Sequence, residues 1–64
     1  MHRHMFPQRI LVVDERHSRR QLCRFFSARG FHCIGASSTQ DAIARANMFR
    51  PHLVLIEVSS LKIE

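Results

Sequence analysis

Three acidic side chains stand next to apolar runs, and they are the residues best placed to do chemistry. Asp14 and Glu15 directly follow the run 10–13, and Glu57 lies near the end of a second run, 53–58. If both runs are neighbouring parallel strands, the three carboxylates meet at the sheet edge where ligands of open α/β sheets collect. A Mg²⁺ ion would relieve their mutual repulsion. The alternative is that they are solvated or paired with a nearby Arg or Lys.

Histidine and cysteine side chains are the other groups that could do chemistry. The spacing of His17, His32, Cys23 and Cys33 pairs no nucleophile with a general base, so the sequence predicts no enzyme. Two cysteines are too few for the disulfide framework of a small secreted domain. We therefore expect both to be reduced, buried thiols of a cytoplasmic protein.

Three apolar segments have the length and composition of β-strands. Residues 10–13 are four large apolar side chains, three of them β-branched, which is typical of a strand covered on both faces. Residues 53–58 repeat this pattern and should be covered in the same way. Residues 31–36 form a weaker strand, in which alternation places Cys33 and Ile34 on opposite faces.

The first helix is predicted for residues 18–29, or from one residue earlier. Leu22, Phe25 and Phe26 have the i, i+3, i+4 spacing of a single apolar face. Gly30 follows where a left-handed C-terminal cap is favoured.

The second helix is predicted to begin at Ser38, which approximates a capping box with Asp41. Small apolar residues along it allow close approach to a sheet. Arg50 and Pro51 should end it, because the residue before a proline is pushed toward extended conformations.

The alternation of strands and helices predicts an α/β fold with a βαβαβ order. Short connections favour a parallel sheet with right-handed crossovers. The two richest strands, 10–13 and 53–58, should be neighbours, and Gly35 marks the remaining strand as an edge. The expected spatial order of the strands is therefore 2-1-3.

The chain is strongly basic, with a formal net charge of +5 that comes from nine Arg and one Lys against five acids. Such a balance favours anionic partners. A basic nucleic-acid-binding protein is therefore one alternative function, and a solvated basic surface is the other interpretation, because the arginines are spread along the chain. The candidate basic surface on the first helix consists of Arg16, Arg19, Arg20 and Arg24.

The expected organisation is a flexible leader (1–8), one small domain (9–58) and a tail (59–64). A chain of 64 residues buries only about 60% of its unfolded surface, so its stability should be marginal. The first residues lack the apolar core of a signal peptide, and no apolar run approaches the ~20 residues of a membrane span. We expect a soluble, cytoplasmic protein without a membrane partner.

Taken together, these segments resemble the amino-terminal half of a response-regulator receiver domain of the two-component signalling family. Residues 10–15 resemble its first strand and acidic pair, 20–26 its first helix, 36–42 the start of its second helix, and 50–58 its third strand with the phosphorylation position. The resemblance implies half of a flavodoxin-like parallel sheet and a role in bacterial signalling or transcriptional regulation.

The departures from that family bear on function. Glu57 stands where the family has a phosphate-accepting aspartate, and Leu61-Lys62 replace the family's Pro-Gly turn. The chain also ends before the family's fourth and fifth strands, which bring the Ser or Thr and the Lys that contact the phosphoryl group. Because oriented donors and metal do most of the work in phosphoryl transfer, we expect a degenerate pseudo-receiver without phosphotransfer.

The expected function is a non-catalytic, phosphorylation-independent interaction module. A bare apolar strand edge templates association, so a homodimer is the simplest partner, with a receiver, a kinase or another regulatory protein as alternatives. The chain would otherwise be a fragment of a longer response regulator. The candidate interaction surface, with the tail at a dimer interface, consists of Phe25, Phe26, Leu53, Leu55, Leu61 and Ile63.

Overall fold

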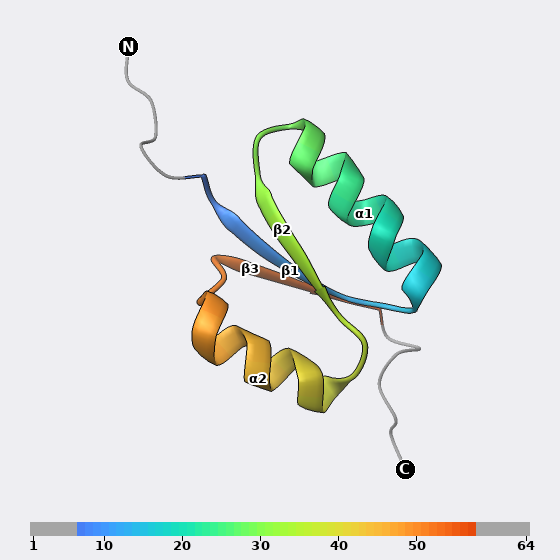
Figure 1. The fold of residues 1–64 in the computed structure, drawn as a ribbon, viewed down its shortest axis with the longest axis vertical. Coiled ribbons are helices and arrows are strands. Elements are labelled where there is room, and N and C mark those ends of the chain that lie inside the picture. Colours follow the sequence, from blue (N-terminus) through green and yellow to red (C-terminus); the bar gives the residue numbers. More distant parts are fainter. Residues whose placement is uncertain (1–6, 58–64) are drawn as a thin grey trace.

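The fold is built around one central strand with two strands beside it and a helix over each face (Figure 1). A computed structural model describes residues 7–57. The elements alternate in the predicted order. They are β1 (Arg9–Val13), α1 (Arg16–Ala28), β2 (His32–Ala36), α2 (Thr39–Phe49) and β3 (Leu53–Ile56).

The three strands form a parallel sheet in the order β2-β1-β3, which confirms the predicted topology. In the register, Val13 lies between Ala36 of β2 and Ile56 of β3. One step further, the Glu57 N–H donates to the Val13 carbonyl at 3.0 Å. The carboxyl ends of β1 and β3 therefore lie together at one edge of the sheet.

Strand β1 is the core of the molecule, because four of its five side chains are buried from both sides. Leu11 and Val13 pack with Ala36 on the face that α2 covers. The alternate residues, Ile10 and Val12, point to the face of α1. No helix in the described part of the chain is long and apolar enough to cross a membrane.

Helix α1 begins at Arg16, earlier than the sequence pattern predicted. Glu15 is its N-cap, although glutamate is not among the residues that usually cap helices. At the other end, Gly30 has the predicted left-handed backbone, with φ +92°. The N–H groups of Gly30 and Phe31 donate to the carbonyls of Ser27 and Phe26, and the rings of Phe26 and Phe31 pack edge to face. This arrangement is a Schellman motif with its hydrophobic contact.

Helix α2 has the predicted N-cap, because the Ser38 hydroxyl accepts a hydrogen bond from the Asp41 N–H at 3.1 Å. The Asp41 carboxylate accepts from the N–H of Ser37, one residue before the position of an ideal capping box. The helix ends before Pro51 as expected, but Arg50 is left-handed (φ 54°, ψ 64°) and not extended. Both conformations avoid the α-helical region that the following proline disfavours.

Strand β3 departs from the expectation that it would be covered like β1. Within residues 7–57, Leu53, Val54 and Ile56 are 48%, 42% and 48% exposed. The physical reason is the position of the helices, since α1 lies mainly over β2 and α2 lies over β1 and β2. Among the described residues, no strand pairs with the outer edge of β3.

The central position of β1 predicts a large difference between two apolar truncations. Leu11→Ala should lower the free energy of unfolding by about 2–5 kcal/mol, because Leu11 is 1% exposed and its removal leaves a cavity. Ile43→Ala on α2, where Ile43 is 60% exposed, should change it by no more than about 0.5 kcal/mol. Urea denaturation measures both values, and equal losses would contradict the assignment of the core.

Candidate functional site

Asp14 is the buried member of the predicted acidic cluster. It directly follows β1 and is 9% exposed. Its Oδ1 accepts a hydrogen bond of 2.7 Å from the Glu15 N–H. The carboxylate therefore shapes the turn that carries the chain from β1 into α1.

Glu15 acts as the cap of α1. Its two carboxylate oxygens accept hydrogen bonds from the N–H groups of His17 and Ser18, both at 3.0 Å, and from the Ser18 hydroxyl at 2.8 Å. The Ser18 hydroxyl and the two N–H groups hold the pKa of Glu15 below its ordinary value. The helix dipole also favours a negative charge at this end. Glu15 is thus committed to the helix.

Glu57 and Asp14 line the same cavity of about 220 Å³, beside the end of the sheet. This is the pairing that the neighbouring carboxyl ends of β1 and β3 predicted. The other lining residues are aliphatic, and one of them, Leu22, comes from α1. Among residues 7–57, the cavity therefore combines two carboxylates with an apolar wall, and no cationic side chain or hydroxyl group of this described part lines it.

The predicted Mg²⁺ site of Asp14, Glu15 and Glu57 is not formed in the described residues. There, no three His, Cys, Asp or Glu side chains are grouped so that they could hold one metal ion. The reason is local: the carboxylate oxygens of Glu15 are occupied by the first turn of α1. Sequence spacing could not show this, because it brings strand ends together without telling where each side chain turns.

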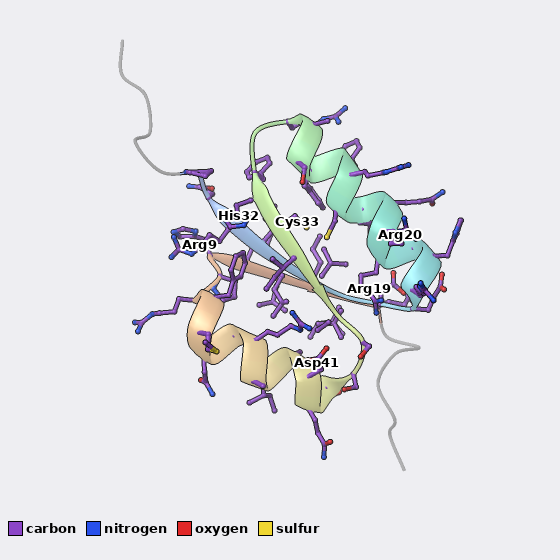
Figure 2. All side chains as sticks on the ribbon, in the orientation of Figure 1. Arg9, Arg19, Arg20, His32, Cys33 and Asp41 are labelled. Atoms are coloured by element: carbon purple, nitrogen blue, oxygen red, sulfur yellow. The ribbon has the colours of Figure 1, made fainter. Side chains whose placement is uncertain are left out.

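The predicted basic surface is divided by the helix geometry. Arg16, Arg20 and Arg24 are exposed and follow one another at four-residue intervals, so they form a single stripe along α1. Arg19 is half-buried and turns toward β2 (Figure 2). A Cβ atom added to Gly35 would come within 2.5 Å of the Arg19 side chain, so the missing side chain of Gly35 makes room for Arg19.

The predicted interaction surface is divided between two elements. Phe25 lies on α1, half-exposed, with the Arg29 guanidinium carbon 3.6 Å from its ring centre. Phe26 is half-buried in the C-terminal cap of the same helix. Leu53 is exposed and Leu55 half-buried, both on β3. Two further members, Leu61 and Ile63, lie outside the described residues, as do the tail and most of the leader.

A close pair of thiols was missed at the level of sequence. Cys23 of α1 and Cys33 of β2 are half-buried, and their sulfur atoms lie 2.7 Å apart. The sequence indicated the position of each cysteine separately: Cys23 follows Leu22 on the apolar side of the helix, and alternation places Cys33 on one face of its strand. The crossover of α1 onto β2 brings both cysteines together.

No family model, curated protein or solved structure matches this chain.

The capping role of Glu15 predicts a pH-dependent loss on mutation. A lowered pKa means that the carboxylate stabilises the folded state above the pKa of unfolded glutamate, and that this contribution is lost as the pH falls through the lower folded value. Glu15→Gln should lower the Tm by a few degrees at neutral pH, and the deficit should shrink in acid.

Thermal unfolding at several pH values measures this deficit. Glu57→Gln is the matched control, because it removes the same charge from the same sheet edge without touching the helix cap. A Glu15→Gln deficit that is equal at neutral and acidic pH would show that the carboxylate charge does not matter.

Proposed function

We propose that this chain is a receiver-like interaction module that binds a second copy of itself through β3 and acts without phosphotransfer. Its expected setting is bacterial signalling or transcriptional regulation. The observation that carries the proposal is the state of β3: Leu53, Val54 and Ile56 are about half exposed, and the outer edge of the strand is unpaired within residues 7–57. The resemblance to receiver domains supports the setting.

The chemistry of β3 favours strand pairing. Its four residues, Leu53–Ile56, are all apolar and carry no charge that would discourage another strand. An added strand would satisfy the outward backbone groups and cover the exposed side chains at the same time. Val54 and Ile56 also line an apolar hollow of about 190 Å³ beside α2, which a partner could fill.

The distribution of charge favours a second copy as the partner. The arginine stripe lies on α1, which covers β2, and β1 separates β2 from β3. Two copies that meet through β3 would therefore keep these charges apart. Pairing across a two-fold axis also closes the assembly, because the same edge is used by both copies.

The acidic cavity supports the absence of phosphotransfer. Phosphoryl transfer needs cationic or hydrogen-bonding groups that stabilise the charge of the transferring group. Of the residues that the structure describes, those that line the cavity with Asp14 and Glu57 are aliphatic. A phosphoryl group on Glu57 would meet a like charge there.

The phosphotransfer half of the proposal has a direct test. With acetyl phosphate and Mg²⁺, the intact mass of the protein should show no phosphoryl adduct. Glu57→Asp should show none either, because the variant restores the acceptor but adds no cationic or hydrogen-bonding group to the lining that residues 7–57 give the cavity. A stable adduct on Glu57 in the unmodified protein would refute this part of the proposal.

The association half is tested by a charge in β3. Val54→Glu should convert the dimer to a monomer in sedimentation velocity at micromolar concentration, because it places a carboxylate in the paired edge. Met48→Glu is the matched control, since Met48 is apolar and 87% exposed on α2, away from the sheet. A folded wild-type monomer, or equal effects of both variants, would contradict the assignment of β3.

Nucleic-acid binding through Arg16, Arg20 and Arg24 is the second candidate function. The exposed stripe along α1 favours it, and α1 contains no acidic residue. It ranks lower because, in the part of the chain that the structure describes, no platform of exposed aromatic side chains accompanies the stripe: Phe25 is covered in part by Arg29. Retention on DNA that falls with salt, and that is lost when the three arginines are replaced by Gln, would favour this candidate.

A further inference from the structure

The pair Cys23 and Cys33 brings two free thiols from different elements into contact. Cys23 lies on α1 and Cys33 lies on β2, where it faces the helix (Figure 2). Their sulfur atoms are 2.7 Å apart, and ten positions separate them in the sequence. A contact this short needs only a small movement to become a covalent bond.

The pair is open to small reagents from one side. Both cysteines line a cavity of about 370 Å³, together with Arg19 and Arg20 from α1 and Arg45 from α2. The Nε of Arg45 is paired with the Oδ1 of Asp41 at 3.0 Å. Arg19 and Arg20 therefore supply the positive charge of the cavity from α1, the helix that carries Cys23. These arginines make the wall of the cavity basic, and a basic wall attracts anions.

We propose that Cys23 and Cys33 are a modification site at which a hydroperoxide forms an intramolecular disulfide between α1 and β2. This inference is independent of the proposed dimer. The ligand class follows from the site: two adjacent thiols that line a cavity of about 370 Å³ are accessible to a small peroxide.

The two thiols have different roles in the reaction. Burial, and then the contact with Cys23, raise the pKa of Cys33 to about 12, so Cys33 remains protonated at neutral pH. We assign the first attack to Cys23. Its sulfur bonds to the terminal peroxide oxygen and the O–O bond breaks. The leaving alkoxide takes up the proton that the Cys23 thiol loses, and a sulfenic acid remains on Cys23.

The second step closes the disulfide. The Cys33 sulfur attacks the Cys23 sulfur and expels hydroxide, which takes the Cys33 proton and leaves as water. In total, two thiols and one hydroperoxide give one disulfide, one alcohol and one water. The thiols are oxidised by two electrons and the peroxide is reduced by two.

The experiment treats the reduced, full-length chain with hydrogen peroxide, for which the alcohol product is a second water. Intact mass should show the loss of two hydrogen atoms, and non-reducing peptide mapping should join the peptides that contain Cys23 and Cys33. Dithiothreitol should reverse both changes. Oxygen adducts on separate cysteines, or disulfides only between chains, would overturn the proposal.

Single-cysteine variants test the order of the steps. Dimedone, which traps sulfenic acids, should label Cys23 in Cys33→Ser faster than it labels Cys33 in Cys23→Ser. The reverse order would overturn the assignment of Cys23 as the attacking thiol. The disulfide itself is read from the unmodified protein, so this part of the test does not depend on how well a variant folds.

Discussion

The structure depends on one requirement, which is that β1 be hydrogen-bonded along both edges and covered on both faces. Its side chains are apolar on alternate sides, so neither face can be left to water, and its backbone groups need partners once water is excluded. Strands β2 and β3 supply the edges, and α1 and α2 supply the faces. A short parallel sheet with two helical crossovers provides both edges and both faces.

The same requirement explains why β3 is exposed. The two short helices that cover β1 also lie over β2, and neither has β3 as its main contact. Strand β3 completes the ladder of β1 but, within residues 7–57, gains little cover in return. The burial of β1 and the exposed edge of β3 thus result from the same arrangement, and the proposed association follows from it.

Patterns of single elements could be read from the sequence, and so could their order. The apolar run 10–13 predicted the central strand, Gly35 the edge, and Gly30 and Ser38 the helix ends. Details that depend on where a side chain turns could not be read. A glutamate at position 15 is compatible with a metal ligand and with a helix cap, and only the path of the following turn decides between these two roles.

For the candidate site, the sequence could predict which strand ends meet, but not which side chains of a helix and a strand touch. The meeting of Asp14 and Glu57 follows from parallel strands that share an edge, so it was foreseen. The contact of Cys23 with Cys33 depends on how far α1 is shifted along β2, which no periodicity contains. The orientation of Arg19 against Gly35 is of the same kind, because it requires the distance between a helix and a strand.

Hydrogen exchange of the β3 amides, followed as the protein is diluted, tests the central claim most directly. If a second copy covers the outer edge of β3, protection of residues 53–56 should fall as the dimer dissociates, while the amides of β1 keep theirs. Protection of β3 that is unchanged across dilution would contradict the account, because the edge would then be either uncovered in both states or shielded from within a single chain.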